Sequence, residues 1–462
     1  MSLSFDALRP LVEGLPSIAM LSSMDGPGAG AAAVRLQTGL AAAGADVTIY
    51  VMNKTSISRT VLEIDKGPKL WRTYALLSGI ALRHYPKRPP YFELFSVNKS
   101  PVDLASITGL NKAGIVHLNW IVGMVAFPQA ATFLRGKRVV WTLMDMNPLS
   151  GGCHCTAGCE KYADGGCAAC PQLGERSGGA DVASQNFSAR RKAYAEMDMA
   201  VVANSSWLTA CAKRSILLRA FSQTTISAPY IDSYIFFPQP RAWARIAFGI
   251  SHRRKVILFG ASGIGRRNKG LHILRQALEV LLPQWEEEVP LLFVFGGDVQ
   301  GALPKGYECI SPGRLNPSEL AKAYSAADIF VSPSFQDNLP NTVNEALSCG
   351  TPVVCFDRFS SEDVVINGVT GFTVEHPGLP LTAEGILTHE PAYSVPGEAV
   401  TALADAIRLA LTMPPDEYES MRERCAIKAR EVFSPVLQTA RYLRLYRSLL
   451  GLRHIDVDGV PQ

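Results

Sequence analysis

The sequence predicts an α/β protein of two doubly wound, Rossmann-like domains that face each other across a central cleft. Three observations favour this fold class. The chain has 462 residues, which is too long for one ordinary core and typical of two or three domains. Short apolar runs alternate with helical sequence, as in parallel sheets that carry helices on both faces. The pattern is interrupted by an extended stretch near 226–245 and then starts again.

The first domain is expected over residues 1–235. It opens with an apolar run at 17–23, a glycine- and proline-rich turn, an alanine-rich helix and a second apolar run at 47–52. That order is strand, loop, helix and strand, the repeating unit of a parallel sheet. Three later apolar runs predict further buried strands: "GIVHLNW" (114–120), "RVVWTLMDM" (138–146) and "MAVVANS" (199–205).

The second domain is expected over residues 236–434. Its predicted strands are five short apolar runs: "KVILFG" (255–260), "PLLFVFGG" (290–297), "YECISPGRL" (307–315), "ADIFVSPS" (327–334) and "TPVVCFD" (351–357). Segment 374–398 is rich in proline and glycine, which predicts a long loop or insertion. The helix expected at 435–462 is predicted to pack back on the first domain. Ligands of open α/β sheets bind at the carboxyl ends of the strands, and nucleotides are the usual ones.

Composition excludes several classes of function. Hydrophobic residues make up 47% of the chain and charged residues 19%, so the protein is globular rather than disordered. The net charge of +4 is small and the 45 basic residues are scattered, which argues against a nucleic acid partner. The start of the chain lacks the pattern of a secretory signal, and the apolar stretch 115–134 holds too many polar residues to span a membrane. A cytoplasmic, reducing location is therefore expected, in which the ten cysteines stay as thiols or bind metal.

Two carboxylates, Asp337 and Glu345, stand eight positions apart in "PSFQDNLPNTVNEAL". Pro340 suits the first turn of a helix, so the free N–H groups of Asn341 and Thr342 would face an anion with the positive end of the helix dipole. One carboxylate before that anion and one beyond it would then hold hydroxyl groups on either side. The spacing alone equally fits a capped helix with solvated carboxylates.

The longer stretch 323–374 resembles the C-terminal signature of glycosyltransferase family 4, a family of retaining enzymes with the two-domain GT-B fold. The signature has two acidic residues with seven between them, followed by a glycine-proline-valine turn. Asp337 takes the first acidic position in place of the commoner glutamate. The resemblance implies an acceptor-side first domain and a nucleotide-sugar-binding second domain. It further implies that Asp337 contacts the donor sugar, that Glu345 contacts the ribose, and that the donor phosphate meets a loop comprising Asn338, Leu339, Pro340, Asn341 and Thr342.

Two glycine loops extend the resemblance. "FGASGIGRRNKGLHILRQAL" (259–278) is similar to the family's phosphate-binding loop, with Lys269 as its lysine. Either Arg266 or Arg267 would be the second cation, and Gly263 lies in the same loop. Such cations would stabilise a departing diphosphate, whereas an exposed basic turn is the alternative. In the N-terminal glycine loop, the backbone at Gly28 and Gly30 would approach donor phosphate or acceptor.

Other polar residues stand near strand ends in the first domain. His117 and Trp120 resemble the family's H-x-x-W, which implies a contact with acceptor or sugar. Asp145 follows Met144, where the family usually carries a histidine that touches the donor sugar. That departure leaves the identity of the sugar open, and His154 is the candidate to reach the cleft instead.

A cysteine-bearing insert is expected at 150–175. It resembles one in a bacterial branch of the family associated with exopolysaccharide and lipopolysaccharide assembly. The spacing C-x-C-x3-C-x7-C-x2-C predicts a structural zinc site, with Cys155 or His154 as alternative ligands to the first of four cysteines. Two disulfides or free thiols are the alternatives. The four cysteines expected to bind zinc are Cys153, Cys159, Cys167 and Cys170.

Taken with the resemblance, these features predict a retaining bacterial glycosyltransferase that needs no catalytic metal. It would move a sugar from a nucleotide diphosphate to a polysaccharide or lipid-linked oligosaccharide, with peripheral contact at the inner face of the plasma membrane. A nucleotide-sugar epimerase or hydrolase is one alternative. A non-catalytic protein of the same fold, which binds a glycan or a partner enzyme, is another.

Overall fold

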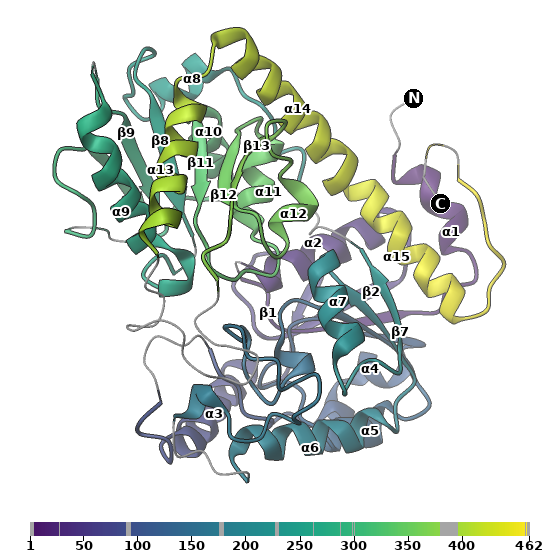
Figure 1. Ribbon diagram of the computed structural model, residues 1–462. Helices are drawn as coiled ribbons and strands as arrows, with labels where there is room; N and C mark the ends of the chain where they lie inside the picture. Colours follow the sequence, from purple (N-terminus) through teal and green to yellow (C-terminus); the bar gives the residue numbers. More distant parts are fainter. Residues whose placement is uncertain are drawn as a thin grey trace. The chain divides into compact units, whose positions relative to one another are not determined.

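A computed structural model describes residues 4–457 and 459, apart from 27, 89–93, 175–179, 227–230, 262, 287, 298, 300 and 379–395. Most of the loop or insertion predicted at 374–398 thus lies outside the described residues. The chain divides into two compact units (Figure 1). Unit 1 comprises the chain up to residue 230 together with 435–462, and unit 2 comprises 231–380 and 387–434.

Unit 1 is built on a seven-stranded parallel sheet with the order β3-β2-β1-β4-β5-β6-β7. Its strands are β1 (Ile18–Met24), β2 (Val47–Asn53), β3 (Val61–Glu63), β4 (Ile115–Leu118), β5 (Arg138–Leu143), β6 (Met199–Ala203) and β7 (Ser222–Thr225). Its helices are α1 (Arg9–Val12), α2 (Ala29–Ala42), α3 (Gly67–Leu82), α4 (Thr108–Lys112), α5 (Gln129–Leu134), α6 (Val182–Tyr194), α7 (Ser206–Arg214) and α15 (Pro435–Leu449). The last of these packs against α1 and α2.

Unit 2 has a six-stranded parallel sheet with the order β10-β9-β8-β11-β12-β13. Its strands are β8 (Val256–Gly260), β9 (Leu291–Phe295), β10 (Cys309–Gly313), β11 (Ile329–Ser332), β12 (Val353–Phe356) and β13 (Gly371–Val374). Its helices are α8 (Arg241–Ile246), α9 (Leu271–Leu281), α10 (Pro317–Ala326), α11 (Asn341–Ser348), α12 (Ser361–Val364), α13 (Gly397–Leu411) and α14 (Pro415–Phe433).

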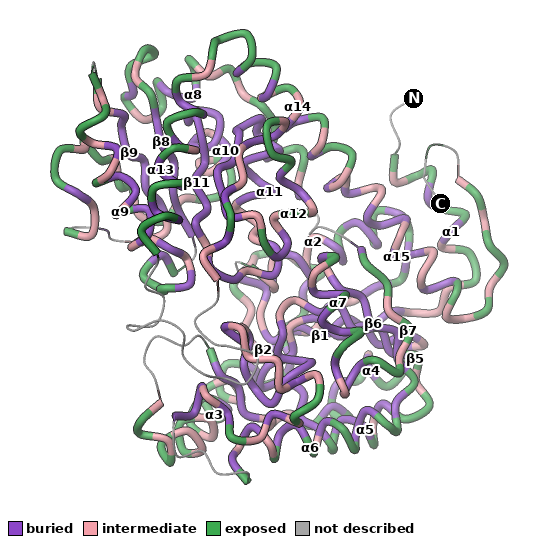
Figure 2. Tube along the Cα trace, viewed as in Figure 1, coloured by how far each residue is buried: buried purple, intermediate pink, exposed green. Residues whose placement is uncertain are grey.

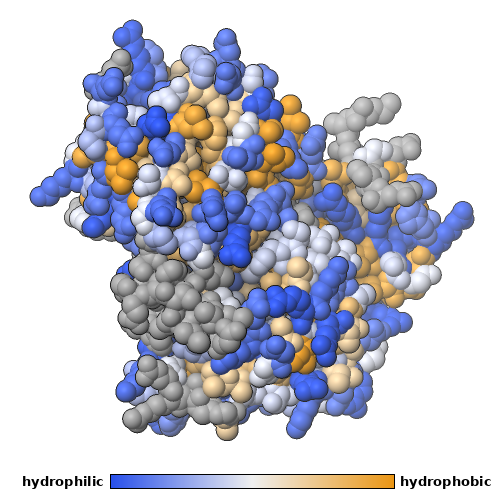
Figure 3. Space-filling model, viewed as in Figure 1, coloured by the Kyte–Doolittle hydropathy of each residue, from blue (hydrophilic) through white to orange (hydrophobic). Residues whose placement is uncertain are grey.

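The two sheets form the cores of their units. Every residue of β4, β6, β8, β9, β11 and β12 is buried, because helices cover both faces of a parallel sheet and leave no polar side (Figure 2). On the face shown in Figure 3, hydrophilic residues dominate and hydrophobic ones are scattered. The α/β class with two doubly wound sheets, predicted from the recurring apolar runs, is confirmed. Among the described helices, none is long and apolar enough to cross a membrane.

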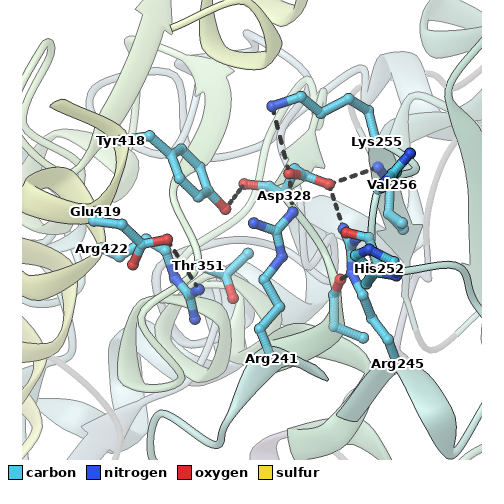
Figure 4. A network of polar contacts seen from close by, with 12 residues as sticks. Arg241, Arg245, His252, Lys255, Val256, Asp328, Thr351, Tyr418, Glu419 and Arg422 are labelled. Atoms are coloured by element: carbon cyan, nitrogen blue, oxygen red, sulfur yellow. Dashed lines mark hydrogen bonds and ion pairs between the residues drawn. The ribbon is translucent and has the colours of Figure 1, made fainter. Parts of the chain in front are cut away.

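A buried ionic network secures the amino ends of the strands in unit 2 (Figure 4). The side chain of Asp328, which immediately precedes β11, is fully buried and pairs with Arg241 and Arg245 of α8. It also accepts a hydrogen bond from the backbone N–H of Val256 at 2.7 Å, while the Tyr418 hydroxyl donates to the Asp328 carbonyl at 2.9 Å. A buried carboxylate is tolerated only with such partners, so this network fixes α8 and α14 to the edge opposite the candidate site.

Candidate functional site

The strand order of unit 2 places a candidate site at the carboxyl ends of β8 and β11. The two strands are neighbours at the centre of the sheet, where the chain order reverses and the crossover helices leave to opposite faces. Open α/β sheets bind their ligands at this point. The loops that follow β8 and β11 meet here, since the backbone N–H of Phe335 donates to the carbonyl of Asn268 at 2.9 Å.

The side chains of Lys269 and Asp337 form an ion pair in this place. Each is about one-fifth exposed, at 19% and 20%, so the pair is accessible from one side only. Both line one cavity, together with Pro340 and Thr342 at the start of α11. The cavity therefore combines a cation, a carboxylate and a helix N-terminus.

Gly270 explains why a glycine follows the lysine. Its φ is +76°, and a Cβ there would stand 1.9 Å from the carbonyl oxygen of Pro333. Left-handed backbone and this close approach together admit no side chain at that position. The contact seats the loop after β8 against the loop after β11, which brings Lys269 to Asp337.

The start of α11 matches the expected anion site in its geometry. Pro340 precedes the helix, and the structure gives no side-chain cap for its first N–H groups. Asn338 and Leu339 are buried in the loop before it, at 7% exposure each. Whether the N–H groups of Asn341 and Thr342 hold a phosphate stays a prediction.

Glu345 lies further along α11 and is nearly buried, at 6% exposure. The Tyr324 hydroxyl of α10 donates to its Oε2 at 3.2 Å, which orients the carboxylate. Before Lys269, the side chains of Arg266 and Arg267 are both exposed, and Gly263 has a φ of +77°. The described contacts favour neither arginine as the second cation.

Sequence reasoning missed His376, which binds the loop after β11 that carries this site. Its ring packs between Phe335, Phe356 and Phe359, and its Nε2 lies 2.6 Å from the carbonyl oxygen of Phe335. The N–H of Gly378 donates to Nδ1 at 3.0 Å, so Nε2 carries the proton and donates to Phe335. Burial lowers the pKa of His376 to about 4, which keeps the ring neutral. The signal in the sequence was a histidine two residues past a strand.

The glycine loop of unit 1 follows β1. Gly28 has a φ of +85° and precedes α2, and a Cβ at Gly30 would stand 2.5 Å from the carbonyl oxygen of Met24. The side chain of Asp25, which was not predicted to matter, accepts hydrogen bonds from the backbone N–H of Thr55 at 2.7 Å and of Ser56 at 2.9 Å. These contacts hold the loop at the carboxyl end of β1.

Trp120, Asp145 and His154 form one network. Trp120 Nε1 donates to Asp145 Oδ2 at 2.9 Å, and His154 Nδ1 lies 2.5 Å from the same oxygen. The other ring nitrogen of His154 is 2.7 Å from the Ser96 hydroxyl. Because both nitrogens are engaged and the ring is buried, His154 positions Asp145 and does not replace the histidine missing at Met144.

His117 is placed differently from the expectation of a substrate contact. The residue is fully buried, with Nδ1 2.6 Å from the Tyr446 hydroxyl of α15 and Nε2 2.7 Å from the Thr142 hydroxyl. The Tyr442 hydroxyl lies 3.0 Å from the same threonine oxygen. Burial lowers the pKa of His117 to about 3, so the ring is neutral and joins α15 to the sheet.

The insert gathers four of its five cysteines around one pocket. Cys167 Sγ accepts a hydrogen bond from the N–H of Gly151 at 3.2 Å, and burial raises the pKa of the Cys153 thiol to about 12. Among the described residues, no three side chains of metal-binding type are arranged to hold an ion, and no disulfide is formed. The placed side chains thus add no support for zinc, and the zinc site stays a prediction from the cysteine spacing. The cavity is lined by Cys153, Cys159, Cys167 and Cys170.

Comparisons with known proteins agree with this geometry. Residues 254–412 match the family model of Glycosyl transferases group 1. The D-inositol 3-phosphate glycosyltransferase 1 of Catenulispora acidiphila is 32% identical over 162 residues, which cover 32% of this chain. The match spans only 38% of that relative's length.

Two solved structures resemble the chain over nearly all of its length. Sucrose-phosphate synthase from Thermosynechococcus elongatus has a TM-score of 0.63 and 17% identity, over 94% of this chain and 99% of that one. Alr3699/HepE of Anabaena, solved with UDP and glucose, has a TM-score of 0.57 and 14% identity, over 94% and 100%. At such identities the likeness shows the fold, and the GT-B class predicted from the sequence is confirmed.

Proposed function

We propose that this protein is a retaining glycosyltransferase that moves a sugar from a nucleotide diphosphate to a polysaccharide or lipid-linked oligosaccharide. One observation carries the proposal. Lys269, Asp337 and the N-terminus of α11 converge on one cavity at the carboxyl ends of β8 and β11, inside the region matched by the family model. A cation and the N-terminus of a helix suit a diphosphate, and a carboxylate suits the hydroxyl groups of a sugar. The UDP and glucose bound by Alr3699/HepE favour a donor of this class.

The proposed reaction breaks the bond between the sugar's anomeric carbon and the diphosphate oxygen. The acceptor oxygen attacks on the same face and forms the new bond, and its proton passes to the departing diphosphate. Lys269 and either Arg266 or Arg267 stabilise the charge that develops on the leaving group. No protein nucleophile and no catalytic metal take part.

The roles of the carboxylates follow from their surroundings. Asp337 leaves Lys269 when the diphosphate arrives and accepts hydrogen bonds from the sugar. Glu345, held by Tyr324, accepts from the ribose hydroxyls. In unit 1, the loop at Gly28 and the carboxylate of Asp145 are assigned to the acceptor side, with peripheral contact at a membrane.

The test is a thermal-shift screen of the full chain against UDP-, GDP- and dTDP-sugars, followed by release of the nucleoside diphosphate with cell-envelope glycans added as acceptor. We expect one nucleotide sugar to stabilise the protein, and Glu345→Ala to lose that shift while Glu423→Ala, at an exposed carboxylate of α14, keeps it. Release without an acceptor would indicate a hydrolase. Binding with no turnover on any acceptor would indicate a non-catalytic binding protein.

A further inference from the structure

Helix α3 presents an unusual surface in unit 1. Its inner side packs on the core through Tyr74, which is 5% exposed, and through Trp71 and Leu82. Its outer side has two large apolar residues in water, Leu76 at 64% and Ile80 at 40% exposure. Exposed and intermediate positions recur along the helix in Figure 2. A helix that is apolar on both sides needs a second partner for the outer one.

Cations flank these apolar residues at helical spacing. Lys69 lies two turns and Arg72 one turn before Leu76, and Arg83 lies one turn after Ile80, all three exposed. Positions three or four apart share one face of a helix, so the five residues form a single stripe. We name this stripe the α3 outer face: Lys69, Arg72, Leu76, Ile80 and Arg83.

The charged residues in and just after α3 are all basic. Residues 66–88 contain six lysines and arginines and no aspartate or glutamate. Within the described residues, no ion pair is recorded for Lys69, Arg72 or Arg83. A solvated helix of ordinary type mixes both signs, whereas unpaired cations around exposed leucine and isoleucine match an anionic surface with an apolar interior.

The position of α3 in the fold adds to this argument. A Cβ at Gly67, the first residue of the helix, would stand 2.1 Å from the carbonyl oxygen of Met52 near the end of β2. A Cβ at Gly123, in the loop after β4, would stand 2.6 Å from the ring of Tyr74. The helix is thus seated on the carboxyl ends of the strands, the same edge of unit 1 that carries the glycine loop and Asp145.

We propose that the α3 outer face is a docking surface for a membrane rich in anionic lipid. Leu76 and Ile80 enter the boundary between headgroups and acyl chains, while Lys69, Arg72 and Arg83 contact lipid phosphates. The inference rests on the proposed function only in that it extends the membrane contact named there. Its test measures binding alone and needs neither donor nor acceptor.

The experiment is flotation of the full chain with vesicles of phosphatidylcholine containing about 30 mol% phosphatidylglycerol, against vesicles of phosphatidylcholine alone. We expect binding to the anionic vesicles only, weakened by salt. Since each cation near such a surface contributes about fivefold in partitioning, the paired variant Lys69→Glu with Arg72→Glu should bind at least about 25-fold more weakly. Leu76→Ser with Ile80→Ser should also reduce binding severely.

Matched controls change equally exposed residues elsewhere. Leu409→Ser with Ile427→Ser alters apolar residues of 53% and 47% exposure in α13 and α14, and should leave binding intact. No binding to anionic vesicles, or full binding by both α3 variants, would overturn the proposal. If the charge reversal abolishes binding and the serine pair has no effect, the face contacts headgroup phosphates alone, and the proposed entry of Leu76 and Ile80 into the membrane is wrong.

Discussion

Replacing Lys269 by alanine tests the assignment of the site most directly. The ammonium lies against the Asp337 carboxylate, and both side chains are about four-fifths removed from water. In the proposed reaction the same ammonium faces a diphosphate whose charge grows as the bond to the sugar breaks. Lys269→Ala therefore removes a charge that is already in place before the reaction starts.

The size of the effect follows from this geometry. Two unit charges about 4 Å apart interact by about 4 kcal/mol at an effective dielectric constant of roughly 20. The ammonium already interacts with Asp337 before the reaction, so only part of this energy is gained in the transition state. The net loss of transition-state stabilisation in Lys269→Ala should be ~3 kcal/mol, which is about 100-fold in rate. Lys269→Arg keeps the charge and should lose much less.

The assay is nucleoside diphosphate release at saturating donor, with the thermal midpoint of each variant measured beside it. The double variant Lys269→Ala with Asp337→Asn separates two causes, since it removes the carboxylate that would otherwise repel the diphosphate. A rate for Lys269→Ala within about threefold of the parent would refute the reasoning. So would a loss of activity that is matched by loss of the fold.

The other predictions concern specificity, packing, pH and metal. Asp337→Asn should relax the preference among sugars more than it weakens nucleotide affinity, because an amide keeps the shape but loses the charged acceptor; the reverse result in competition binding would place the donor the other way round. Gly270→Ala should lower the free energy of unfolding by more than about 2 kcal/mol in urea titrations, whereas Gly249→Ala, at a φ of +66° with nothing within 4 Å, should cost only about 1 kcal/mol; equal losses would contradict the contact with Pro333. Because the pKa of His376 falls from 6.5 to about 4 on folding, its contribution to the free energy of unfolding should be constant above pH 6.5 and decline by about 3 kcal/mol toward pH 4, in addition to the decline caused by His117. A pH profile of His376→Gln equal to that of the parent would show that His376 does not contribute. Metal analysis of protein purified without added zinc, with thiols counted after denaturation, should find one equivalent of zinc; less than about a tenth of an equivalent, with all ten thiols titrating, would exclude both metal and disulfides.

The central strands of each sheet were predictable because burial on both faces produces continuous apolar runs in the sequence, whereas β3, β7 and β13 at the sheet edges were not predicted. "KVILFG" and "ADIFVSPS" are continuous apolar runs, and they became β8 and β11 with every residue buried. Lys269 and Asp337 were each named from the family resemblance. Their ion pair, which joins residues 68 positions apart, depends on β8 and β11 being neighbours, and no local spacing carries that information.

The histidines show where sequence reasoning ends. His117 was expected to face a ligand, and His376 was not noticed. Both follow or lie within a strand near its carboxyl end, and in both cases the neighbours that bind the ring come from distant parts of the chain. Packing of α15 buries the ring of His117, and the loop of Phe335 binds the ring of His376. Tertiary contacts therefore decide the role of each ring.

The packing of α15 on unit 1 has a consequence for how the protein folds during translation. His117 and Thr142 are synthesised early, yet Tyr446 follows His117 by 329 positions and Tyr442 follows Thr142 by 300. About 200 of these residues, between 230 and 435, build unit 2. Translation proceeds at roughly 5–20 residues per second, so about 10–40 s pass before α15 is made. During this time the polar groups and the apolar surface that α15 later covers stay exposed on the first sheet. The second unit has all its strands and helices before this time ends. The unit made first is therefore completed last, and premature termination near residue 434 would release a chain whose N-terminal half is the part that chaperones must hold.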